Sequence, residues 1–158
     1  MAADINNSPL RNVPPPLIFL GLLGLGFLLD YLFPIKLLRL PWTPRIIGSS
    51  ILFMISGYLA LGSIIVLLRN KTPFDPSKTT VKIVHEGPYR LSRNPMYLAL
   101  LFLLAGVAVI SGSIWLFLSL PVLLIVLDIW AVRPEEAYLE RNFGDRYLAY
   151  KAKVRRWL

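Results

Sequence analysis

Long apolar blocks separated by short charged stretches dominate the pattern of this chain. Ile46 to Leu68 gives 23 residues without a charge, and Ile114 to Val132 gives 19 residues with one charge. A membrane-spanning helix needs about 17–25 mainly apolar residues, because about 30 Å of hydrocarbon is crossed at about 1.5 Å per residue. Shorter apolar blocks cover 17–33 and 96–110. The pattern predicts an all-α integral membrane protein with about four transmembrane helices, at 17–33, 46–68, 94–111 and 114–132.

The connection between the third and fourth predicted helices is very short. It consists of Ser111-Gly112-Ser113, which predicts a tight antiparallel hairpin. The start of the third helix and the end of the fourth should then lie on the same side of the membrane. We therefore expect the polar stretches 85–97 and 133–150 to lie side by side and to form one site.

The segment 133–158 reads as helical and amphipathic. Pro134 suits the first turn of a helix, and Gly144 suits its end. After Gly144, basic residues surround an apolar stripe, which is typical of a helix at a membrane surface; a solvated basic tail is the alternative. The stripe consists of Tyr147, Tyr150, Val154 and Trp157. We expect this helical segment to complete a single membrane domain, 1–158.

Charge predicts the orientation of the chain. It has 17 Lys and Arg, a net charge of +8 and a sequence that is 56% hydrophobic. Fourteen of these cations fall at the two termini and in the loop 69–94, and three fall in the loop between the first two helices. The positive-inside rule places the two termini and the loop 69–94 in the cytoplasm. The rule, together with attraction to anionic lipid headgroups, explains the net charge without nucleic acid.

Composition narrows the chemistry. The chain has no cysteine and one histidine, so thiolate sites and histidine-pair metal sites are not expected. The run "GLLGLG", Gly21 to Gly26, lies inside an apolar helix and lacks the strand of a dinucleotide site, which favours close helix packing instead. What remains is a cluster of arginine, carboxylate and tyrosine side chains at the membrane boundary. Such a cluster suits a zwitterionic, cationic cofactor such as S-adenosylmethionine.

The stretches "GPYRLSRNPMYLA" and "RPEEAYLERNFGDRYLAYKAKVRRW" together resemble the isoprenylcysteine carboxyl methyltransferase and phospholipid methyltransferase superfamily of integral-membrane enzymes. The resemblance covers about residues 80–158. It departs from the family pattern at Asn94, where histidine is frequent, and at Ala99, where glycine is frequent. The positions that match are Gly87, Tyr89, Arg93, Pro95, Tyr97, Arg133, Glu135, Glu136, Phe143, Gly144, Tyr147 and Tyr150.

The resemblance implies a pocket for S-adenosylmethionine between the third helix, the fourth helix and the C-terminal segment. It implies that His85, Gly87, Tyr89, Arg93, Asn94, Pro95, Tyr97, Glu135 and Glu136 bind the cofactor. Arg133, Glu136 and Glu86 are the implied catalytic residues. The alternative for Glu135 and Glu136 is structural, because carboxylates in a first helical turn compensate the helix dipole.

The implied activity is methyl transfer to a lipophilic acceptor that arrives from the bilayer. An isoprenylcysteine-type carboxylate or another lipid acid is favoured, and it would need no general base. A phospholipid or other lipid amine is the alternative, with Glu86, Glu136 or His85 as candidate bases. Two other classes stay open: a non-catalytic membrane scaffold and a membrane reductase. Binding of S-adenosylhomocysteine would favour the methyltransferase, binding of NADPH would favour the reductase, and binding of neither would favour the scaffold.

Overall fold

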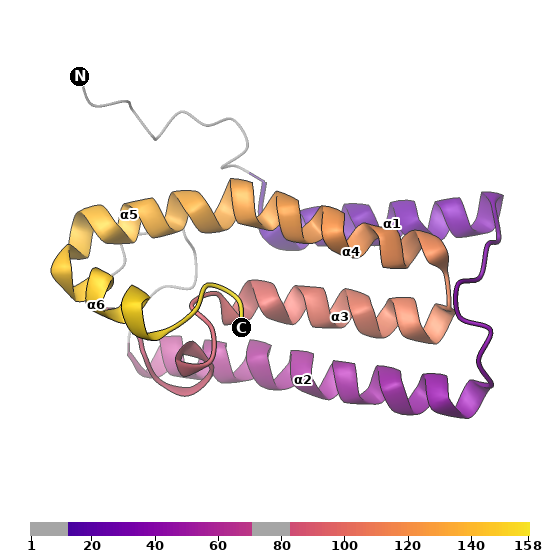
Figure 1. Ribbon diagram of the computed structural model, residues 1–158, viewed down its shortest axis with the longest axis horizontal. Coiled ribbons are helices and arrows are strands. Elements are labelled where there is room, and N and C mark those ends of the chain that lie inside the picture. Colours follow the sequence, from indigo (N-terminus) through magenta and orange to yellow (C-terminus); the bar gives the residue numbers. More distant parts are fainter. Residues whose placement is uncertain (1–12, 71–82) are drawn as a thin grey trace, which may run out of the picture.

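The computed structural model describes residues 13–70 and 83–158, which form helices and no strand apart from an isolated bridge between Lys36 and Ser113. The predicted loop charges at Lys71, Lys78 and Lys82 lie outside the described residues. The helices are α1 (Pro15–Leu32), α2 (Trp42–Arg69), the 3₁₀ helix η3 (Gly87–Arg90), α3 (Pro95–Ser111), α4 (Ile114–Leu127), the π-helix η4 (Asp128–Val132), α5 (Arg133–Phe143) and α6 (Asp145–Lys153) (Figure 1).

The predicted all-α membrane fold is confirmed over the described residues. Helices α1 and α2 and the continuous rod from Ile114 to Phe143 are long and apolar enough to cross a membrane. Helix α3 is also apolar, but it is shorter, with 17 residues. It packs beside α2 and α4 and is aligned with them along the bundle (Figure 1). Each of the four predicted apolar segments is thus a helix.

Helix α3 lies at the centre of the packing. Helix α2 covers one side of it, α4 covers the other, and α1 packs on α4 and α3. Two glycines allow the close approaches. A Cβ on Gly26 would lie 2.5 Å from a methyl of Leu116, and one on Gly106 would lie 2.3 Å from the ring of Phe53. Helix packing therefore explains Gly26, at the end of the "GLLGLG" run. A Cβ on Gly21 or Gly24 would meet nothing within 4 Å, so the packing prediction was wrong for these two glycines.

The predicted hairpin of α3 and α4 turns at Gly112. Its backbone has φ +66°, a left-handed conformation that ends α3 and that favours glycine. A Cβ there would also lie 2.9 Å from the carbonyl oxygen of Leu38, in the α1–α2 connection. This connection is bound to the turn, because Leu37 N–H donates to the Gly112 carbonyl (2.8 Å). Residues of the α1–α2 connection thus cover the turn between α3 and α4.

The membrane helix α4 continues into α5 through one π-turn. In η4 the N–H of Arg133 donates to the carbonyl of Asp128, five residues earlier. The same spacing brings the two side chains together, with Arg133 Nε 2.7 Å from Asp128 Oδ2. Such turns contain an extra residue and are frequent at functional sites.

The C-terminal segment departs from the predicted stripe. Helices α5 and α6 form, and Gly144 ends α5 with φ +50°. Helix α6 ends at Lys153, however, so the prediction that one helical stripe continues through Val154 to Trp157 was wrong. The chain turns back instead, and Trp157 packs against the core beside α3. Ser92, Arg93 and Asn94, which precede α3, donate hydrogen bonds to the carbonyls of Arg155 and Arg156. These bonds hold the segment against α3 in place of a further helical turn.

Candidate functional site

A pocket of about 580 Å³ lies where the start of α3, the start of α5 and the end of α2 meet. This is within the range of about 300–1,000 Å³ that is usual for small-molecule sites. One wall is polar and aromatic: Tyr89, Arg93, Asn94, Tyr97, Glu135, Glu136, Tyr147 and Tyr150. Most of the remaining lining is apolar and comes from α2, α3 and the start of α1: Pro14, Pro15, Pro16, Ser56, Ala60, Leu67, Pro95, Met96, Ala99, Leu100 and Leu103. Ile83, Val84 and Leu139 complete it. The site is therefore divided into a polar part and a part built from membrane helices.

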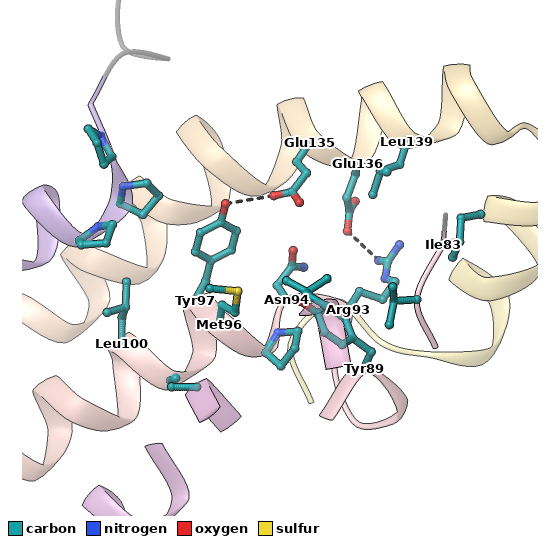
Figure 2. Close-up of a pocket in the computed structure, with 18 of the residues that line it drawn as sticks. Ile83, Tyr89, Arg93, Asn94, Met96, Tyr97, Leu100, Glu135, Glu136 and Leu139 are labelled. Carbon is teal, nitrogen blue, oxygen red and sulfur yellow. Dashed lines mark hydrogen bonds and ion pairs between the residues drawn. The ribbon is translucent and has the colours of Figure 1, made fainter. Parts of the chain in front are cut away.

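Two side-chain links join α3 and its preceding loop to α5 across this pocket. The Tyr97 hydroxyl donates to Glu135 Oε2 at 3.0 Å, and Arg93 Nη2 lies 3.1 Å from Glu136 Oε1. Figure 2 shows the two links side by side, with both carboxylates descending from α5. The predicted meeting of the stretches 85–97 and 133–150 is thus present in the structure. The short hairpin and the continuous α4–α5 rod produce it.

Arg93 still has donors to offer. Its side chain is only 8% exposed, and one of its nitrogens is engaged by Glu136. Its Nε and Nη1 atoms are buried and have no hydrogen-bond partner among the described residues. A buried unpaired donor is costly and calls for an explanation, and a ligand anion is a common one. Arg93 therefore contributes to the pocket wall a buried guanidinium with two nitrogens that no described residue satisfies.

Three tyrosines complete the polar wall in neutral form. Burial raises the pKa of Tyr147 to about 12, and the carboxylate of Glu136 adds to the rise, while the neighbouring Arg93 opposes it. Burial likewise raises the pKa of Tyr89 and of Tyr150. The Tyr150 hydroxyl donates to the carbonyl of Tyr89 at 2.7 Å, which fixes α6 against η3. The three phenols stay protonated at physiological pH and present aromatic faces and neutral hydroxyls.

The structure divides the residues that the sequence predicted. Seven line the pocket: Tyr89, Arg93, Asn94, Pro95, Tyr97, Glu135 and Glu136. His85 and Glu86 are exposed and lie outside the lining. Gly87 is also outside, and its φ of +55° serves the turn that packs on Val66 of α2.

Arg133 also lies outside the pocket, which departs from its implied role as a catalytic residue. Its side chain is 61% exposed and pairs with Asp128. The π-turn explains this position, because a five-residue spacing aligns Arg133 with Asp128 on the rod. A regular α-helix would align residues three or four apart.

Several lining residues were missing from the predicted site. Tyr147 and Tyr150 were assigned to the family pattern and to a surface stripe, although their three-residue spacing places them on one helix face. The prolines Pro14 to Pro16 carry no chemical signal that would connect them to a site more than 70 residues away. Arg156 does not line the pocket, but it is more than a charge of the predicted basic segment, because it pairs with Glu136 and Asp128.

Comparisons with known proteins agree with this picture. The chain is 41% identical, over 63 residues, to an uncharacterized protein from Haemophilus influenzae; the match covers 40% of this chain and all of that protein. No solved structure matches the chain. The sequence profile of the phospholipid methyltransferase family matches residues 44–146, which include α3, the π-turn, α5 and the whole acidic side of the pocket. Because this match covers more than half of the chain, the chain belongs to the phospholipid methyltransferase family, within the superfamily of integral-membrane methyltransferases that its motifs resemble.

Proposed function

We propose that this protein transfers a methyl group from S-adenosylmethionine to a lipophilic acceptor that reaches the pocket from the bilayer. The observation that carries the proposal is Arg93, a buried arginine with two unpaired donors in a pocket of ligand size. When bound, S-adenosylmethionine supplies an electrophilic methyl group on a sulfonium. The remaining chemistry is binding, orientation and exclusion of water by this chain.

The polar wall fits the amino-acid end of this cofactor. Arg93 would bind the carboxylate through its free Nε and Nη1 atoms, as a guanidinium fork favours. Glu135, which is bonded to Tyr97 rather than to an arginine, would accept the ammonium group. The rings of Tyr89, Tyr147 and Tyr150 suit the cationic sulfonium and the adenine. His85, Glu86 and Arg133 have no part in this arrangement, because they lie outside the lining.

The apolar wall fits the acceptor. Helices α2 and α3 and the start of α1 supply it, so a hydrocarbon chain would contact surfaces that also belong to the membrane bundle. We favour a lipid carboxylate, which is already anionic and needs no base; methyl transfer to its oxygen gives an ester. A lipid amine is the second candidate, favoured by the family match, and it would lose a proton to Glu135 or to solvent.

Cofactor binding tests the proposal directly. Calorimetry of the full chain in detergent should detect S-adenosylhomocysteine and should not detect NADPH. The acceptor class follows from incubating the protein with methyl-labelled S-adenosylmethionine and bilayer lipids. Label that is released by mild alkali comes from a methyl ester, and label that resists alkali comes from a methylated amine. Absence of any response to S-adenosylhomocysteine would refute the methyltransferase proposal.

The proposal places the pocket and the two termini on the cytoplasmic side, where S-adenosylmethionine is made. The cation distribution supports this orientation. Because the chain has no cysteine, single cysteines can report it. A cysteine at Leu40, which is 51% exposed in the α1–α2 connection, should react with a membrane-impermeant maleimide in intact cells. One at the exposed Ala152 should react only after permeabilisation; the reverse pattern would place the pocket outside the cell.

A further inference from the structure

Arg156 occupies the centre of a chain of charges behind the pocket. Its Nη1 lies 3.2 Å from Asp128 Oδ1, its Nε lies 3.1 Å from Glu136 Oε1, and its Nη2 lies 2.8 Å from Glu136 Oε2. The two bonds to Glu136 form a fork, the strongest geometry for this pair. The hydrogen bond to Glu136 raises the pKa of Arg156, so its charge is fixed at all physiological pH.

The backbone around Arg156 is bound to the residues that precede α3. The carbonyl of Arg155 accepts the N–H of Arg93 at 3.0 Å. The carbonyl of Arg156 accepts the Ser92 hydroxyl and the Asn94 amide, each at 3.0 Å. Residues 155–156 therefore fasten the segment that carries Arg93 and, through the Arg156 side chain, the helix that carries Glu136.

Glu136 stands between the two arginines. It is 5% exposed, and Arg93 contacts it with one nitrogen while Arg156 contacts it with two. The fork of Arg156 uses one acceptor site on each oxygen of Glu136, and Arg93 is engaged at Nη2 alone, with Nε and Nη1 unpaired among the described residues. Without Arg156, Glu136 would be free to pair with Arg93 through both oxygens and to take one of the two donors that now lack a partner.

We propose that Arg156 is a positioning residue that holds Glu136 away from full pairing with Arg93, so that Arg93 keeps two donors for the carboxylate of the bound amino-acid group. The inference rests on the proposed function for the identity of the ligand. It also divides the two adjacent glutamates. Glu136 supports Arg93 from behind, and Glu135 is the carboxylate that faces the ligand.

The test compares two ligands that differ in the amino-acid group. S-adenosylhomocysteine has the carboxylate, and 5′-methylthioadenosine lacks the whole amino-acid group. In Arg156→Gln we expect the dissociation constant for S-adenosylhomocysteine to rise at least tenfold, about 1.4 kcal/mol, while that for methylthioadenosine changes less than twofold. Arg155→Gln is the matched control, since it removes an adjacent exposed charge, and it should change neither constant more than twofold.

A second pair of variants keeps the test decisive if Arg156→Gln does not fold. Arg156→Lys keeps the charge but loses the fork, so it should show the same selective loss for S-adenosylhomocysteine at smaller size. Adding Glu136→Gln to either variant removes the competing carboxylate and should recover part of the lost affinity.

Two results would overturn the inference while leaving the proposed function intact. One is a wild-type protein that binds S-adenosylhomocysteine and Arg156 variants that bind it equally well. The other is an equal loss for both ligands, which would mean that Arg156 only supports the fold. A wild-type protein that binds neither ligand would instead overturn the proposed function, and this inference with it.

Discussion

The two ends of the helix bundle each contain a partly buried arginine, and they use it differently. At the end where α3 turns into α4, Arg45 of α2 donates Nε to the carbonyl of Val109 at 3.2 Å and Nη2 to the carbonyl of Ile110. Its guanidinium also lies 5.0 Å from the ring centre of Trp42. At the other end, Arg93 is bound by a carboxylate at one nitrogen and leaves two donors unpaired beside the pocket.

The difference separates a structural arginine from a binding arginine. Arg45 satisfies carbonyls at the end of α3 that would otherwise lack partners, which is a capping role. Arg93 also interacts with the Tyr147 hydroxyl, but its Nε and Nη1 atoms make no hydrogen bond to the described residues, and it lines a pocket. The two residues have the same chemistry at opposite ends of one helix. Removal of each should therefore affect different measurements.

The largest effect should come from Arg93. Changing Arg93→Met keeps the buried stem and removes the donors, while Glu136 stays paired with Arg156. We expect the affinity for S-adenosylhomocysteine to fall at least 30-fold, about 2 kcal/mol or more, because the ligand carboxylate loses a desolvated partner. Calorimetry in detergent measures it, with the melting temperature as the folding control. A change below threefold in a folded variant would remove Arg93 from the site.

The matched change at the other end should reverse this pattern. Arg45→Met should leave the affinity for S-adenosylhomocysteine within twofold of the wild type. It should cost about 1–3 kcal/mol of stability, because the carbonyls of Val109 and Ile110 lose a charged donor. Thermal unfolding in detergent, followed by circular dichroism, measures the loss. An unchanged melting temperature together with weakened binding would contradict the division between the two ends.

The smallest effect is expected at Arg133. This arginine lies at the same end of the bundle as Arg93 but outside the pocket, so the two can be compared directly. Arg133→Gln removes an exposed ion pair to Asp128, and such pairs contribute about 0–1 kcal/mol. Asp128 keeps its contact with Arg156, so ligand affinity should stay within twofold of the wild type. The same calorimetric titration decides it. A tenfold loss would return Arg133 to the site, in which the sequence motif implied a catalytic role for it.

The sequence predicted the bundle well because the dominant signal there is length and hydrophobicity. Each apolar block became a helix within a few residues of its predicted bounds, as shown by Pro95–Ser111 against the predicted 94–111. The three-residue link after α3 was enough to bring Tyr97 and Glu135 together. These features depend on local composition and on short connections, which a linear pattern records.

The parts that the sequence did not predict depend on rotation about helix axes and on chain reversal. Arg133 belongs to the same short motif as Glu135 and Glu136. The direction of its side chain depends on a π-turn, however, and the sequence pattern does not predict that turn. The return of Arg156 and Trp157 to α3 depends on backbone acceptors at Arg155 and Arg156, and every residue offers such a carbonyl. A pattern of side chains cannot distinguish these acceptors from others.

The π-turn at Asp128–Val132 also sets the angular phase of the site relative to the bilayer. Helices α4 and α5 form one rod, so the lipid-facing side of α4 and the pocket-facing side of α5 are offset by the one extra residue that η4 contains. A single-residue deletion there would rotate α5 by about 100° and draw it in by about 1.5 Å. Glu135 and Glu136 would then turn away from Tyr97 and Arg93, although no side chain of the pocket had changed. The membrane span and the candidate site are thus kept in phase by one turn of backbone.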